Sequence, residues 1–268
     1  MDIVLLTIIY TGASFTQGVT GFGFGMSSVP LVALLYSPGV AVGMNAIVGT
    51  TNCFYNFYLL RKHVDYRRTL RTLLFSALFV PAGAYFLVRF DERLVFILMG
   101  LMIIVVAIGA LWGKEGPKET QRRKSGNGKE NDGRSGSKPK PAVVHILSAI
   151  LPAVGGMLAG AFASPGPAMV PYMFARERDP YTAKANLQYY FSLISIFVIV
   201  SHVVAGNITV ENSLRALPYL PLVFVFTKLG AVLAFRLGRN TFRKVVNYSL
   251  LLLGLYLILR NGYSLVVA

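Results

Sequence analysis

The sequence predicts an all-α multi-pass membrane protein made of two inverted repeats, each a broken, re-entrant helical segment followed by three transmembrane helices. Three observations predict this fold: an apolar composition, a polar segment that divides the chain into similar halves, and breaks at matching places in both halves. Hydrophobic residues make up 54% of the 268-residue chain and charged residues 14%, whereas a typical soluble domain has about 25% charged residues.

The apolar residues gather in runs long enough to cross a bilayer, which takes about 20 residues in a helix. Full-length candidates lie at 41–60, 72–88, 94–112, 185–204, 216–235 and 245–259. Two further apolar regions, 3–36 and 142–175, are longer and are interrupted. Because no positively charged stretch precedes the first apolar run, we do not expect a cleaved signal peptide.

The segment 113–141 is polar, rich in Gly, Ser and Lys, and without apolar periodicity. A segment of this composition cannot bury a core, so we expect a flexible cytoplasmic linker between a first repeat at 1–112 and a second at 142–268. The halves share an order of elements and a few identities. A shift of 141 residues places Gly25, Pro30 and Asn45 on Gly166, Pro171 and Asn186.

The charges of the loops predict how the halves are oriented. Loop 61–71 has five basic residues and the linker has nine, and loops rich in Lys and Arg stay on the cytoplasmic side. In the second half, loop 202–215 is nearly neutral, whereas 236–244 is strongly basic. The equivalent loops 61–71 and 202–215 are therefore expected on opposite sides, which is the arrangement of inverted repeats.

Each half contains one break within an apolar region. The stretch QGVTGFGFGMSS, 17–28, has four glycines within eight residues, and GAFASPGPAM, 160–169, interrupts the second half. Non-helical backbone at membrane depth must be buried in protein or line a wet cavity. Each break precedes a short apolar arm, 26–36 or 167–175, whose N-terminus offers unpaired N–H groups and a partial positive charge. Two such N-termini facing each other predict an anion site.

Two alternatives to this interpretation stay open. Each broken segment could instead cross the membrane once. A straight 34-residue helix is about 51 Å long and the hydrocarbon core is about 30 Å thick, so a single crossing requires a strong tilt. The glycines could also serve close helix packing, as small residues often do in membranes.

The expected substrate site combines the breaks with polar side chains inside the spans. Its candidate residues are Gln17, Gly21, Gly23, Gly25, Ser27, Ser28, Asn45, Ser164, Gly166, Asn186, Gln188 and Lys228. Ser164 also resembles a helix N-cap, with Pro165 at the first helical position. Lys228 lies near the middle of its span, where a cation is costly and functional by default; a structural partner is the alternative. Amide side chains such as Asn45 could instead hold helices together.

The Gly-rich break ending in Pro30, the motif SPGPAMVPYM at 164–173 and the four-element halves around a polar linker resemble the sulfite exporter TauE/SafE family, also called the toluene-sulfonate uptake permease family. The resemblance covers most of the chain outside 113–141. It implies a multi-pass plasma-membrane transporter of sulfur-containing anions, such as sulfite or organosulfonates. The first break has GFGFG in place of the family's glycine triplet, so Phe22 and Phe24 are candidates to narrow or line the site.

We therefore expect transport of a small anion by alternating access, with an anion channel of the same architecture as the alternative. A non-transporting scaffold would instead have a dry, closed interior. We expect no catalytic residue, metal or cofactor, because the spans hold no nucleophile–base pair or paired carboxylates, Cys53 is the only cysteine, and the histidines are expected at the surface. The basic residues lie between apolar runs, so the expected partners are the anion and the lipid bilayer rather than nucleic acid. The oligomeric state is left open.

Overall fold

The computed structural model describes residues 2–112, 141–177, 179–233 and 239–267. These residues form helices and connecting turns, with no strand among them, which confirms the all-α class. The predicted linker at 113–141 lies outside the described residues, except that Pro141 already begins a helix.

The helices follow the same order in both halves. The first half consists of α1 (Asp2–Thr20), α2 (Phe24–Val32), α3 (Pro38–Leu60), the short 3₁₀ helix η1 (Arg61–His63), α4 (Tyr66–Ala77), α5 (Val80–Arg89) and α6 (Glu92–Trp112). The second consists of α7 (Pro141–Phe162), α8 (Gly166–Arg176), α9 (Pro180–Val204), α10 (Val210–Ala216), η2 (Leu217–Tyr219), α11 (Leu220–Leu233) and α12 (Arg239–Val267). In each half a long helix, a break and a short helix come first.

Several helices are long and apolar enough to cross a membrane, so the chain is a multi-pass membrane protein. Among the described residues these stretches are Asp2–Thr20, Tyr66–Arg89, Glu92–Gly109, Tyr181–Val204 and Val210–Leu233. The predicted span 41–60 falls on α3, which is not among them because it carries buried asparagines along its length.

All three predicted loops are partly helical: α4 begins at Tyr66 within 61–71, and α9 and α10 both extend into 202–215. The basic stretch 236–244 was expected to connect two spans, but α12 already begins at Arg239. The predicted span 245–259 lies within this helix of 29 residues. The helix therefore takes up most of the basic stretch as its first turns.

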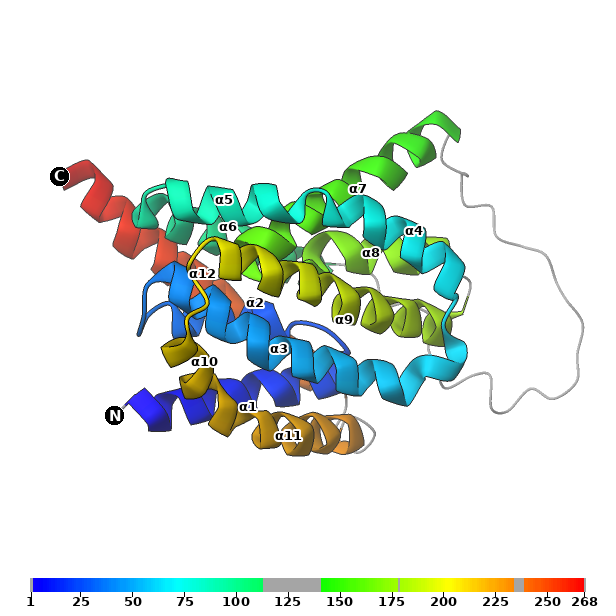
Figure 1. Cartoon of the computed structure of the whole chain (residues 1–268), viewed down its shortest axis with the longest axis horizontal. Helices are drawn as coiled ribbons and strands as arrows, with labels where there is room; N and C mark the ends of the chain where they lie inside the picture. Colours follow the sequence, from blue (N-terminus) through cyan, green and yellow to red (C-terminus); the bar gives the residue numbers. More distant parts are fainter. Residues whose placement is uncertain (1, 113–140, 178, 234–238, 268) are drawn as a thin grey trace, which may run out of the picture.

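The helices pack in pairs that join the two halves. The central helices α3 and α9 lie side by side and run in opposite directions (Figure 1), while α1 packs on α11, α7 on α5, and α6 on α12. Three of these crossings are made at glycines, Gly18 with Gly230, Gly83 with Gly160 and Gly100 with Gly254, where the backbone of the partner helix leaves no room for a Cβ. Small residues at such crossings let transmembrane helices approach closely.

Candidate functional site

The first break comprises residues 21–23, between α1 and α2. Gly21 (φ 86°) and Gly23 (φ 101°) are left-handed, a conformation that glycine adopts without a Cβ clash. Two glutamines hold the break: Gln188 Nε2 donates to the Gly21 carbonyl, and Gln17 Oε1 accepts from the Phe24 N–H at 3.2 Å. The break is thereby fixed to α9, and the first turn of α2 is fixed to α1.

The second break comprises residues 163–165, between α7 and α8. Ala163 has φ 46° and is the only non-glycine with positive φ among the described residues; this conformation costs an L-residue about 1–2 kcal/mol. The prediction that Ser164 caps α8 is wrong, because Pro165 occupies the N-cap position and no side chain caps the helix. The Ser164 N–H bonds to the Leu158 carbonyl at 3.4 Å, which ties Ser164 to the end of α7.

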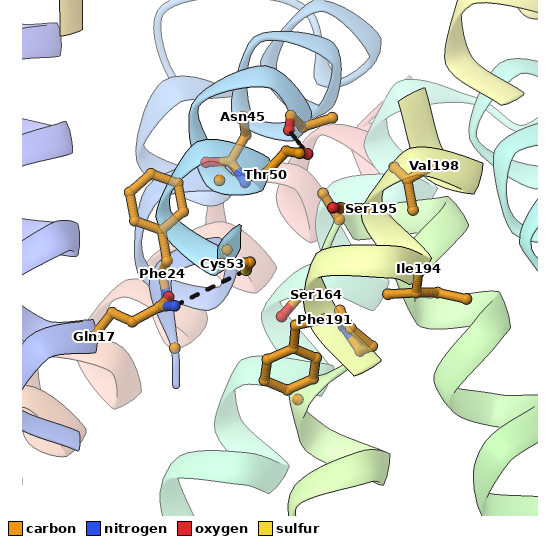
Figure 2. A pocket seen from close by; sticks show the side chains of 17 residues that line it. Gln17, Phe24, Asn45, Thr50, Cys53, Ser164, Phe191, Ile194, Ser195 and Val198 are labelled. Atoms are coloured by element: carbon orange, nitrogen blue, oxygen red, sulfur yellow. Dashed lines mark hydrogen bonds between the residues drawn. The ribbon is translucent and has the colours of Figure 1, made fainter. Parts of the chain in front are cut away.

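The two breaks meet at the centre of the molecule. A Cβ on Gly25 would lie 2.5 Å from the Ala163 carbonyl oxygen, so only glycine permits this approach. The breaks enclose one side of a cavity of about 60 Å³, with α3 and α9 forming the rest (Figure 2). A water needs roughly 10–15 Å³ of such volume, so the cavity has room for several waters or one small anion.

The cavity is lined by polar and apolar groups without a formal charge. Figure 2 shows Gln17, Phe24, Asn45 and Cys53 on one side and Ser164, Phe191 and Ile194 on the other. All lining residues found within the described chain are Gln17, Gly23, Phe24, Gly25, Asn45, Ala46, Gly49, Thr50, Cys53, Ala163, Ser164, Pro165, Gly166, Phe191, Ile194, Ser195 and Val198.

Backbone N–H groups contribute hydrogen-bond donors to this lining. Gly25 and Gly166 lie in the first turns of α2 and α8, where N–H groups have no acceptor inside the helix. No side chain of the N-cap residues Gly23 and Pro165 takes their place. Within the described residues, no acceptor bonds to the Gly25 or Gly166 N–H.

Six of the twelve predicted site residues line the cavity: Gln17, Gly23, Gly25, Asn45, Ser164 and Gly166. The other six, namely Gly21, Ser27, Ser28, Asn186, Gln188 and Lys228, do not. Three of these support the lining instead, since Ser28 Oγ contacts Asn45 Oδ1, Ser27 Oγ donates to the Gly23 carbonyl at 2.8 Å, and Gln188 holds the first break. Asn186 accepts from the Asp65 N–H at 2.8 Å, at the start of α4.

Lys228 is exposed on α11. Its neighbour Thr227 takes the buried position and donates to Asn52 Oδ1 at 3.1 Å. A different lysine, Lys184 of α9, lies near the breaks: a Cβ on Gly21 would be 2.7 Å from its Cε atom. Lys184, which lies against the first break, is thus a cation that the sequence analysis did not single out.

Three polar lining residues were also missed, namely Thr50, Cys53 and Ser195. A signal for Thr50 and Cys53 existed, because α3 contributes Ala46, Gly49, Thr50 and Cys53 at helical spacing, as one face of a helix does. His202 was expected at the surface, but it is buried: its Nε2 bonds to the Gly160 carbonyl at 2.7 Å and its Nδ1 to Asn207 Nδ2 at 2.9 Å. No cluster of three His, Cys, Asp or Glu side chains suited to a metal occurs among the described residues.

Comparison with known proteins assigns the chain to a class. The model of the family described as sulfite exporter TauE/SafE matches residues 6–257. The chain is also 26% identical over 282 residues to the "Probable membrane transporter protein YunE" of Bacillus subtilis (strain 168), covering 98% of this chain and 100% of that protein. No solved structure matches the chain significantly. Both matches point to a membrane transporter rather than an enzyme.

Proposed function

Because the chain belongs to the sulfite exporter TauE/SafE family, we propose that it carries a small sulfur-containing anion, such as sulfite or an organosulfonate, across the plasma membrane by alternating access. The observation that carries this proposal is the meeting of two helix N-termini, those of α2 and α8, at one central cavity. Such N-termini combine free N–H groups with a partial positive charge, and both favour an anion.

The neutral lining supports binding that is also reversible. Gly25 and Gly166 offer N–H groups, and the Ser164 hydroxyl adds a donor from the second break. With no formal cation among the described lining residues, a bound anion directly contacts dipoles and leaves more readily than from a buried ion pair. The volume of about 60 Å³ suits an anion of the size of sulfite better than a bulky aromatic sulfonate.

Alternating access by inverted repeats is supported by the pairing of the halves. If each helix is replaced by its counterpart in the other half, the pair α1–α11 becomes the pair α7–α5. The pairs α3–α9 and α6–α12 are each formed by two counterparts, so they stay the same. The opposite directions of α3 and α9 (Figure 1) fit an inverted relation. The arms α2 and α8 have 9 and 11 residues, about 14 and 17 Å, too short to cross the bilayer, so we propose that they are re-entrant.

Substitution of Gly166 tests the cavity directly. A Cβ on Gly166 meets nothing within 4 Å, so Gly166→Val projects into the cavity without a backbone clash. In proteoliposomes we expect Gly166→Val to lower sulfite uptake at least roughly ten-fold, because a filled site loses the N–H contacts and space that bind the anion. Gly12→Val is the matched control, since Gly12 lies on α1 outside the lining and also has nothing within 4 Å.

Equal sulfite uptake by Gly166→Val and the parent would exclude this cavity as the site. The flux itself separates the two transport modes. A carrier saturates and exchanges labelled anion against unlabelled anion on the other side, whereas a channel shows no such counter-transport.

A further inference from the structure

A second, larger cavity lies between α4, α7 and α8, at the end of α8 opposite the central cavity. Its volume is about 530 Å³. It is lined by Arg68, Arg71, Thr72, Phe75, Ala149, Pro152, Tyr172 and Arg176. None of these residues lines the central cavity, so the two cavities are separate features of the molecule.

One part of this cavity is strongly basic. Arg68 lies 3.5 Å from Glu177, which offsets one of the three arginine charges. Neither Arg71 nor Arg176 forms an ion pair with a carboxylate within the described residues. The guanidinium groups therefore leave about two positive charges uncompensated, and guanidinium is well suited to bidentate contacts with phosphate.

Hydroxyl groups orient part of this basic surface. Arg176 Nη1 donates to the Tyr172 hydroxyl, and the Arg176 guanidinium lies 5.0 Å from the centre of the Tyr172 ring. Thr72 Oγ1 lies 3.2 Å from the same hydroxyl. α4 and α8 thus hold a guanidinium group and two hydroxyls together at the cavity wall.

The other part of the cavity is apolar and continues onto the outer surface. Phe75, Ala149 and Pro152 line it, and next to them Leu74, Leu78 and Ile150 are exposed by 53%, 75% and 50%. The helices α4 and α7 are joined at Ser76, whose Oγ donates to the Pro152 carbonyl.

The position of the arginines matches the level of lipid headgroups. Arg68 and Arg71 lie in the first two turns of α4, at one end of the apolar stretch Tyr66–Arg89, and Arg176 is the last residue of α8. Basic pockets between transmembrane helices on the cytoplasmic side bind anionic headgroups, and loop 61–71 is predicted to be cytoplasmic.

We propose that this cavity binds one anionic phospholipid, with its phosphate group at Arg71 and Arg176 and an acyl chain along Phe75 and Pro152. The lipid would join α4 of the first half to α7 and α8 of the second. Because α8 begins at the central cavity and ends at this one, the lipid stabilises the helix whose N-terminus faces the transported anion. This inference does not depend on the identity of that anion.

The experiment measures lipid binding by the purified full chain in detergent. Native mass spectrometry counts bound lipids, and thermal unfolding gives the shift that each lipid causes. We expect phosphatidylglycerol to raise the unfolding midpoint by several degrees and to remain bound as one molecule, since a ligand that binds only the folded state stabilises it by mass action. Phosphatidylcholine and inorganic phosphate should cause less than a third of that shift.

Two double variants with the same charge change locate the site. R71Q/R176Q should lose at least two thirds of the phosphatidylglycerol shift, each shift being measured against the lipid-free variant. R61Q/R67Q is the matched control: both arginines are exposed near the same end of α4, and neither lines the cavity, so its shift should equal the parent's. Ala149→Phe, which fills the apolar part and keeps every charge, should also lose the shift.

Three results would overturn the proposal. R71Q/R176Q and Ala149→Phe could both keep the full shift, which would place the lipid elsewhere. The control double variant could lose as much as R71Q/R176Q, which would mean non-specific attraction to a basic surface. Inorganic phosphate could match phosphatidylglycerol, which would make the cavity a site for free anions.

Discussion

The glycines around the two breaks have different physical roles. Gly21 and Gly23 adopt left-handed φ values that a Cβ would strain, and Gly25 allows its helix to touch the Ala163 carbonyl. Gly166 has open space where its Cβ would be, so its contribution is room for the ligand. Substitutions at Gly25 and Gly166 should therefore fail for different reasons, the first by separating the breaks and the second by filling the cavity.

A pair of lysine variants tests which cation acts on the bound anion. Lys184 lies against Gly21 of the first break, whereas Lys228 is exposed on α11. Unit charges several ångströms apart at an effective dielectric constant near 20 interact by a few kcal/mol at most. We expect Lys184→Gln to weaken sulfite binding by about 1 kcal/mol, or roughly five-fold, and Lys228→Gln to leave it unchanged, as measured by calorimetric titration.

If Lys228→Gln weakened sulfite binding and Lys184→Gln did not, the cation that acts on the anion would lie on α11, which would contradict the site as described. Equal, parent-like affinities would mean that helix dipoles alone hold the anion. Lys184→Arg, which keeps the charge, serves as the control for altered packing against Gly21.

At the residue scale, the sequence indicates which residues break a helix but not which way a side chain faces. The glycines stand out because they are rare choices inside an apolar helix. Lys228 and Thr227 are adjacent, and a helix turns by about 100° per residue, so one faces the core while the other is exposed. The sequence shows how deep a residue lies within its span. Which side of α11 faces the core, however, depends on the packing of this helix against α1 and α3.

The helices that carry the cavity walls are anchored by caps at their ends. Asp65 Oδ1 accepts from the Arg68 N–H at 3.2 Å at the start of α4, and Asp179 Oδ2 accepts from the Thr182 N–H at 2.9 Å at the start of α9. α9 supplies Phe191, Ile194 and Ser195 to the cavity. A secure first turn of α9 therefore contributes to holding one wall in place.

The Asp179 cap predicts a pH dependence of stability. The Thr182 N–H that donates to Asp179 holds the pKa of this carboxyl below its ordinary value. The cap therefore stabilises the fold fully above the ordinary carboxyl pKa, near about 4, and the stabilisation is lost as the pH falls through the lower folded value. At pH 7, Asp179→Ala should cost about 1 kcal/mol, a fall of a few degrees in the unfolding midpoint.

The midpoints are measured in detergent between pH 3 and pH 7 for the parent and two variants. The gap between the parent and Asp179→Ala should narrow at the acid end. Asp179→Asn keeps a capping oxygen without the titration, so it should match the parent at pH 7; a loss as large as that of Asp179→Ala would contradict the capping role.

At the element scale, breaks and boundaries were predictable where local chemistry sets them. Both breaks fall within the predicted stretches, at residues 21–23 and 163–165. The start of α8 was misplaced by one residue, because the Ser164 N–H bonds back to the Leu158 carbonyl of α7 and Pro165 takes the N-cap position. The helical start of α12 inside a basic stretch was not predictable, since Lys and Arg are good helix formers as well as loop residues.

For the molecule as a whole, the symmetric pairing of helices makes the orientation of the halves the decisive question. The core is shared, since buried residues of α3, α5, α7, α8 and α9 belong to one apolar cluster. Neither half can therefore complete its core alone. In an inverted arrangement, an element of the first half faces one side of the membrane and its counterpart in the second half faces the other side. The central cavity can therefore open to the two sides in turn.

Cysteine labelling in intact cells tests this orientation through two equivalent positions. Lys62 in η1 and Val210 at the start of α10 lie in the predicted connections 61–71 and 202–215, and both are exposed, Val210 by 78%. In a Cys53→Ala background, Val210→Cys should react with a membrane-impermeant maleimide, whereas Lys62→Cys should react only after the cells are permeabilised. The reason is the positive charge of loop 61–71, which retains it in the cytoplasm. Two parallel repeats would place both cysteines on the same side, so equal labelling before permeabilisation would contradict the inverted arrangement and, with it, alternating access by exchange of the halves.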